Sequence, residues 1–165
     1  MKKLTLIRHA KSSWDNPTLA DFDRPLNARG ERDLPALCLR IDEYSLRPEK
    51  ILSSGAKRAE VTASAIADQL RLPLDAMQIL PELYDACYET LLHTLQNQHD
   101  SLRHIMLVGH NPGIEELGYL LTHERLEKYP TCGMLHIHLS VTSWSELAES
   151  CGTKEIFDFP KLHAK

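Results

Sequence analysis

Long apolar runs and closely spaced cysteines are both missing from this chain of 165 residues. No segment approaches the roughly 20 apolar residues that span a bilayer, so we expect no membrane segment. The basic start leads only into the short apolar segment 4–7, which is too short for a secretory leader. The cysteines at 38, 87, 132 and 151 form no C-x-x-C motif, which favours free thiols. These absences predict a cytoplasmic protein.

A general excess of positive charge is missing as well. The net charge is −4, but residues 1–60 hold 12 Lys and Arg against 9 Asp and Glu, whereas residues 61–165 hold 7 against 14. A protein that binds nucleic acid over a broad surface is expected to be basic throughout, so we expect no nucleic-acid partner. The uneven distribution favours a local anion site near the N-terminus.

The apolar segments predict strands that alternate with helices within a single domain, residues 1–165. The expected strands cover 4–7, 49–54, 76–80, 104–110, 133–141 and 153–159, and the expected helices cover 28–44, 56–70, 88–98 and 111–121. Such alternation implies a mostly parallel sheet covered on both faces. Because the last two strands face each other across a short connection, they add one antiparallel strand. We therefore predict an α/β fold: a three-layer α/β/α sandwich with a mostly parallel sheet carrying an antiparallel edge strand.

The helix expected over 28–44 shows both a start signal and a disturbance. Asn27 is a suitable capping residue directly before it. Pro35 lies inside the helical pattern and is expected to bend or delay the helix.

Three of the predicted strands end in residues that can bind an anion. Arg8 and His9 follow the first strand, Arg58 opens the helix after the second, and His110 ends the strand expected over 104–110. Ligands of open α/β sheets bind at the carboxyl ends of the strands, where helix N-termini also offer free N–H groups. If these strands are neighbours, two imidazoles and two guanidiniums meet in one pocket. Such a pocket suits a dianionic phosphoryl group.

The usual phosphoryl-transfer motifs are absent. The sequence has no Cys-x5-Arg motif, no P-loop and no kinase motifs, and no Ser or Cys has an evident helper base. A neutral histidine can itself attack phosphorus and carry the group covalently, because its reference pKa is about 6.5.

The motifs R-H-A, D-R-P-L, S-S-G-A-K-R-A-E-V-T-A, L-P-E-L-Y and L-V-G-H-N-P-G occur in this order along most of the chain. They resemble the SixA-type phosphohistidine phosphatase branch of the histidine phosphatase superfamily. The resemblance implies a set of roles for individual residues. His9 would be the phosphorylated nucleophile, Arg8 and Arg58 would clamp the phosphoryl oxygens, His110 would donate to the transition state, and Arg24 would lie toward the entrance. Arg24 and Lys11 are the substrate-binding candidates, although their sequence context favours plain surface charges that border the site.

The sequence departs from the family pattern at two residues in loops, Ala10 and Gly55, and in the region expected to supply an acid. Ala10 and Gly55 stand where relatives commonly have glycine and proline, so Ala10 must keep a negative φ. The family's carboxylate run is not visible, and Glu82, Asp85 and Glu89 all remain candidates for a proton donor. A phosphohistidine leaves as an imidazole, whose conjugate acid has a pKa of about 6.5, and needs less acid help than an alkoxide.

We therefore expect a phosphatase that needs no metal or cofactor and acts on phosphohistidine of a phosphotransfer or phosphocarrier protein. One alternative is a small-molecule or phosphoserine-type phosphomonoesterase, and another is a phosphoprotein-binding module without catalysis. His136 and His138 share a strand face and could suggest a metal, but without a third ligand cross-strand packing is favoured. The remaining histidines, His104 among them, are expected on the surface.

Overall fold

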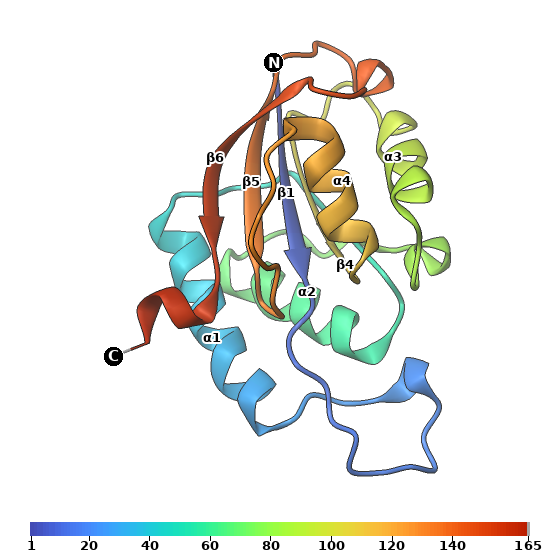
Figure 1. The fold of residues 1–165 in the computed structure, drawn as a ribbon, viewed down its shortest axis with the longest axis vertical. Helices are drawn as coiled ribbons and strands as arrows, with labels where there is room; N and C mark the ends of the chain where they lie inside the picture. Colours follow the sequence, from blue (N-terminus) through green and yellow to red (C-terminus); the bar gives the residue numbers. More distant parts are fainter. Residues whose placement is uncertain (165) are drawn as a thin grey trace.

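A computed structural model of the chain describes residues 1–164 (Figure 1). The strands are β1 (Lys2–Arg8), β2 (Lys50–Ser53), β3 (Met77–Ile79), β4 (His104–Gly109), β5 (Met134–Leu139) and β6 (Gly152–Asp158). The helices are α1 (Ala28–Glu43), α2 (Lys57–Gln69), α3 (Tyr88–Gln96) and α4 (Gly113–Thr122). Short 3-10 turns lie between them, including η1 (Asp21–Asp23), η3 (Pro81–Leu83) and η4 (Trp144–Glu146).

The six strands form one sheet in the order β3-β2-β4-β1-β5-β6. β1 pairs in parallel with β4, β4 with β2, and β2 with β3. β5 runs antiparallel to β1, and β6 runs antiparallel to β5. The predicted fold class is therefore confirmed, with the antiparallel pairing at one edge of a mostly parallel sheet. β5 itself is second from that edge, because β6 covers it.

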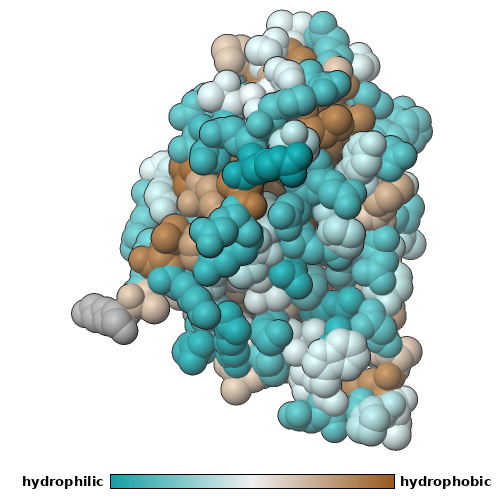
Figure 2. All heavy atoms as spheres, in the orientation of Figure 1, coloured by the Kyte–Doolittle hydropathy of each residue, from teal (hydrophilic) through white to brown (hydrophobic). Residues whose placement is uncertain are grey.

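Helices cover both faces of the sheet and enclose two separate apolar cores. On one face α3, α4 and the buried Trp144 pack against the side chains of Leu4 and Leu6. On the other face α1 and α2 pack against Ile7 and its neighbours. The alternation of side chains along β1 divides its residues between the two cores. The face shown in Figure 2 is mostly hydrophilic, with apolar atoms in small separate groups.

Helix α1 begins where its cap predicts. The side chain of Asn27 accepts a hydrogen bond from the backbone N–H of Gly30. Pro35 lies on the exposed side of α1, and the helix runs unbroken from Ala28 to Glu43, so the expected delay is wrong. On that side the carbonyl that loses its N–H partner can be hydrated instead.

The loop after β1 extends beyond the carboxyl end of the sheet before the chain enters α1 (Figure 1). Its start is held against α1, because the Lys11 carbonyl accepts from the N–H of Asn27. A Cβ at Gly30 would overlap that same carbonyl, so only glycine permits the approach. Ala10 does not have a positive φ, so its position does not require glycine.

His104 is buried, contrary to the expectation that it lies on the surface; only 6% of it is exposed. Its Nε2 and the Nδ1 of His136 each lie 2.8 Å from the hydroxyl of Thr5. The His136 ring also packs against His138, with centroids 5.6 Å apart. Three histidines therefore share one sheet face through packing and one hydroxyl.

No helix among residues 1–164 is long and apolar enough to cross a membrane.

Candidate active site

The carboxyl ends of β1, β2 and β4 bring together the four residues singled out in the sequence. β4 lies between β1 and β2, so the residues after these strands meet at the same edge. The rings of His9 and His110 have centroids 5.0 Å apart, and Arg58 Nε lies 3.4 Å from His9 Nε2. Together with Arg8 these residues line a hollow of about 220 Å³.

His9 is held as a neutral ring whose Nε2 accepts a long hydrogen bond, 3.4 Å, from Arg58 Nε. Its Nδ1 lies 2.7 Å from the carbonyl oxygen of Ala10. A carbonyl only accepts hydrogen bonds, so Nδ1 carries the proton and Nε2 keeps its lone pair. Burial, followed by the positive charges of Arg58 and Arg8 and the neighbouring His110 ring, outweighs the Ala10 bond and lowers the pKa of His9 to about 3. The ring is therefore uncharged and nucleophilic at neutral pH.

Arg58 divides its donors between two directions. Nη1 donates to the backbone carbonyl of Asp21 at 2.7 Å, and Nη2 donates to the Asp21 carboxylate at 2.9 Å. Nε instead points toward Nε2 of His9. The side of the guanidinium that faces His9 remains available to an anion bound there.

Arg8 and His110 each have a buried side-chain nitrogen without a hydrogen-bond partner. Arg8 donates from Nη1 to the Tyr129 carbonyl, but its Nε is buried and unpaired. His110 has Nε2 2.8 Å from Ser54 Oγ, while its Nδ1 is buried and unpaired. Burial lowers the pKa of both groups, to about 4 for His110. Only three such atoms occur among residues 1–164, and two of them lie here. Unpaired buried donors are costly unless a ligand uses them.

Arg24 and Lys11 line the same hollow. Arg24 is buried rather than a plain surface charge; its guanidinium lies 3.5 Å above the Trp14 ring, and its Nε donates to Asp21 at 3.0 Å. Lys11 is half-buried at the rim.

Of the open acid candidates, Asp85 is the one that lines the hollow. Its carboxylate lies 3.9 Å from Nδ1 of His110. Glu82 and Glu89 line a different hollow, between η3 and α3. One of the three carboxylates named from the sequence therefore reaches the hollow, and the sequence did not distinguish it from the other two.

Three further residues around the site were not predicted from the sequence. Asp21 bonds to Arg58 and Arg24, Tyr84 donates its hydroxyl to Asp21, and Ser54 contacts His110. Asp21 stands in the same D-F-D-R-P-L run as Arg24, which is the only sequence signal that could have pointed to it.

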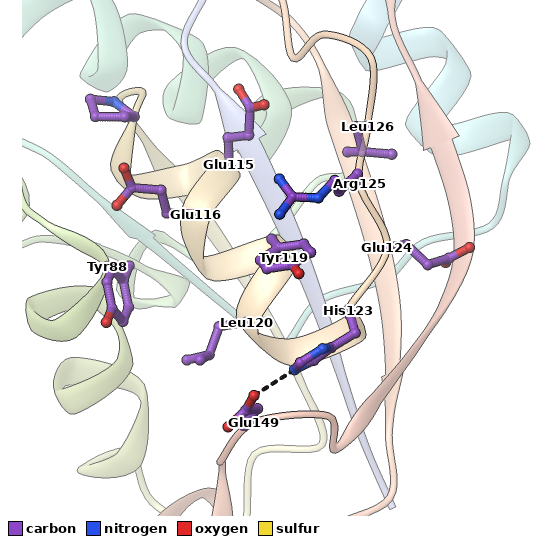
Figure 3. A pocket seen from close by; sticks show the side chains of 11 residues that line it. Tyr88, Glu115, Glu116, Tyr119, Leu120, His123, Glu124, Arg125, Leu126 and Glu149 are labelled. Carbon is purple, nitrogen blue, oxygen red and sulfur yellow. Dashed lines mark ion pairs between the residues drawn. The ribbon is translucent and has the colours of Figure 1, made fainter.

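A second, larger hollow of about 590 Å³ follows the outer side of α4 (Figure 3). Its labelled residues include four glutamates, one of which, Glu149, forms an ion pair with His123 at 2.8 Å. Carboxylates repel a phosphoryl dianion, so the phosphate chemistry belongs to the smaller hollow. Within residues 1–164 no group of three or more His, Cys, Asp or Glu side chains could hold a metal ion, which leaves His136 and His138 without a third ligand.

Comparisons with known proteins point to one family. The sequence model described as histidine phosphatase superfamily (branch 1) matches residues 4–106. An uncharacterised chloroplastic protein of Arabidopsis thaliana is 32% identical over 154 residues, which are 88% of this chain and 70% of that protein. An uncharacterised protein of Mycobacterium tuberculosis is 29% identical over 94% of this chain and 100% of its own length. The structure of an Agrobacterium tumefaciens protein assigned as the phosphohistidine phosphatase SixA is 28% identical, with a TM-score of 0.81, over 96% of this chain and 99% of that one.

Proposed function

Because this chain belongs to branch 1 of the histidine phosphatase superfamily and is a hydrolase of that superfamily, we propose that it removes phosphate from phosphohistidine on a protein. The reaction proceeds through a covalent phospho-His9 intermediate and needs no metal. The observation that carries the proposal is the lone pair of His9 Nε2, which faces Arg58 Nε, beside the unpartnered nitrogens of Arg8 and His110. These groups are what an attacking nitrogen and a phosphoryl group require.

In the first step His9 Nε2 attacks phosphorus opposite the P–N bond of the substrate. A new N–P bond forms at His9, and the electron pair of the old bond returns to the substrate nitrogen. The positive charge that develops on the His9 ring is stabilised by its Nδ1–H bond to the Ala10 carbonyl. Arg8, Arg58 and Nδ1–H of His110 donate to the phosphoryl oxygens, whose charge spreads in the transition state.

In the second step water attacks the phosphorus of phospho-His9. The N–P bond breaks, its electron pair returns to Nε2, and His9 is restored with the proton still on Nδ1. One water proton passes to the released phosphate. Asp85, 3.9 Å from His110 Nδ1, is the carboxylate placed to relay that proton.

The size of the hollow supports a small leaving group. At about 220 Å³ it is below the roughly 300–1,000 Å³ of pockets that enclose whole small molecules. A phosphoryl group and one attached ring fit this size, while the rest of the substrate stays outside, as on a phosphotransfer or phosphocarrier protein. An imidazole that is protonated on its other nitrogen leaves as a neutral ring and needs no strong acid.

A phosphomonoesterase of the same superfamily is the second candidate, and Asp85 favours it. An alkoxide leaving group needs a proton, and Asp85 lies where a donor could supply one. The two candidates therefore differ in how strongly turnover depends on this carboxylate.

Turnover of different phosphorylated substrates tests the proposal. We would compare phosphorylated phosphotransfer and phosphocarrier proteins with sugar phosphates and a phosphoserine peptide. The expected kcat/KM for phosphohistidine proteins exceeds that for alkyl esters by about 10²-fold or more, because an alkoxide is a poorer leaving group than an imidazole and depends more strongly on proton transfer. Equal or faster ester turnover would support the phosphomonoesterase. Tight binding of phosphoprotein without turnover of any substrate would support the binding module.

A further inference from the structure

Asp21 bonds to three side chains around the site, although it does not itself line the hollow. Its carboxylate accepts from Arg58 Nη2 at 2.9 Å, from Arg24 Nε at 3.0 Å and from the Tyr84 hydroxyl. The Tyr84 bond, followed by those from Arg58 and Arg24, lowers the pKa of Asp21 to about 2 against the opposing effect of burial. Asp21 is therefore an anion at neutral pH, bonded on both of its oxygens.

The guanidinium of Arg58 shows what this bonding does. A guanidinium is planar and has two forks: Nη1 with Nη2 at its end, and Nε with Nη2 along its side. Asp21 occupies the end fork, because Nη1 donates to its backbone carbonyl and Nη2 to its carboxylate. Nε remains directed at His9 Nε2, 3.4 Å away. The side fork is thus the one presented to a group on His9.

We infer that Asp21 is a positioning residue: it holds the end fork of Arg58 so that the side fork addresses the phosphoryl group carried by His9. The inference rests on the proposed phospho-His9 chemistry. Asp21 acts through Arg58 and touches neither phosphorus nor its oxygens. Tyr84 supports the same arrangement, because its hydroxyl bonds to Asp21 and its ring packs edge-on against Phe22, with centroids 5.0 Å apart.

A carboxylate so close to an anion site also weakens the binding of phosphate. Its negative charge partly offsets the attraction of Arg58 and Arg24 for phosphate. Removing the charge should therefore leave phosphate binding unchanged or tighter while turnover falls, because the freed guanidinium loses its orientation. A loss of general folding would instead weaken binding and turnover together. The split between the two measurements identifies positioning.

The test measures kcat and the inhibition constant of inorganic phosphate for wild type and for D21N. We expect kcat to fall about 10- to 100-fold, the scale of misplacing a reacting group by about 1 Å, without weaker inhibition by phosphate. D23N is the matched control, because Asp23 lies in the same 3-10 turn and is exposed; it should leave both values unchanged. Y84F, which removes one bond to Asp21, should give a smaller loss of the same kind.

A double-mutant cycle with R58A completes the test. Because Asp21 acts through Arg58, adding D21N to R58A should cost less than about twofold more. If the losses of kcat from D21N and R58A multiply in the double variant, the inference is overturned. A D21N kcat within twofold of wild type, at unchanged thermal stability, would overturn it as well. All variants are assayed on both a phosphohistidine protein and an aryl phosphate. If only the aryl phosphate is turned over, the proposed substrate is wrong, while the aryl phosphate still decides the role of Asp21.

Discussion

The two buried histidines, His104 and His136, lead to a prediction about stability in acid. The Thr5 hydroxyl can donate to one ring nitrogen and accept from the other, and it lies 2.8 Å from both His104 Nε2 and His136 Nδ1. With both rings neutral, this one hydroxyl pairs with both ring nitrogens.

The sign of the effect follows from the pKa values. Burial, and then the neighbouring His136 ring and Lys3, lowers the pKa of His104 to about 3. Burial, and then His138 and Lys3, lowers that of His136 to about 4. The folded pKa values lie below the unfolded value of about 6.5, so this stability is fully present above that pH. It is lost as the pH falls toward 4 and 3, because the unfolded state binds protons that the folded state does not.

The size of the effect depends on the number of protons bound on unfolding rather than on the exact pKa values of the folded state. Between about pH 6 and pH 5, unfolding binds nearly one proton at each of these histidines. Each histidine then contributes a slope of about 1.0–1.3 kcal/mol per pH unit to the free energy of unfolding. The variant H104Q, which keeps a polar partner for Thr5, should have a slope smaller by about this amount.

Urea unfolding at several pH values, followed by the fluorescence of the buried Trp144, measures these slopes. H99Q is the control, because His99 is exposed, and its slope should equal that of wild type. If H104Q keeps the full wild-type slope, His104 does not take up a proton on unfolding. The neutral hydrogen-bonded pair would then be refuted.

Further predictions concern catalysis. R8A and R58A should each lower kcat by about 10²–10³-fold, the loss typical of a preorganised donor, and R58K should recover little, because an ammonium lacks the fork; full recovery would show that charge alone matters. Activity should survive EDTA, because the arginines and His110 already supply the stabilising charge and donors; loss with rescue by one divalent ion would contradict this. E82Q should leave phosphohistidine turnover within about tenfold of wild type, while D85N should slow alkyl esters more than phosphohistidine, by up to about 10²-fold. A hundredfold loss on phosphohistidine from E82Q would defeat the leaving-group argument.

The fold and the main pocket residues were predictable because their signals are local. Strand β4 is an apolar run with a histidine directly after it, and α1 has its cap one residue before it begins. Carboxyl ends of neighbouring parallel strands meet at one edge, so residues that follow such strands in the sequence can be assigned to a common site. Arg8, His9, Arg58 and His110 do lie together there.

The misjudged and missed residues depend on tertiary contacts. His104 bonds to Thr5, which is 99 positions away, while Arg24 stacks on Trp14 and bonds to Asp21 within one irregular loop. Tyr84 reaches Asp21 across 63 positions. The periodicity of apolar residues along the chain gives no information about such pairs.

The choice among the acids depends on backbone conformation. Asp85 has a φ of 48°, in the left-handed region, directly after η3 and Tyr84. Such single-residue turns decide which side chain reaches the pocket, and Asp tolerates them. The sequence alone could not show that Asp85, rather than Glu82, lines the hollow.

The central claim is that His9 carries the phosphoryl group during turnover, and trapping that group tests it most directly. The enzyme would be mixed with a phosphohistidine protein, quenched rapidly under alkaline conditions and digested for mass spectrometry. We expect an acid-labile phosphate on the peptide that contains His9, formed and consumed at the rate of turnover, and absent from H9A, which should keep its fold and lose activity. A phosphate on another residue, or H9A turnover near that of wild type, would contradict the claim.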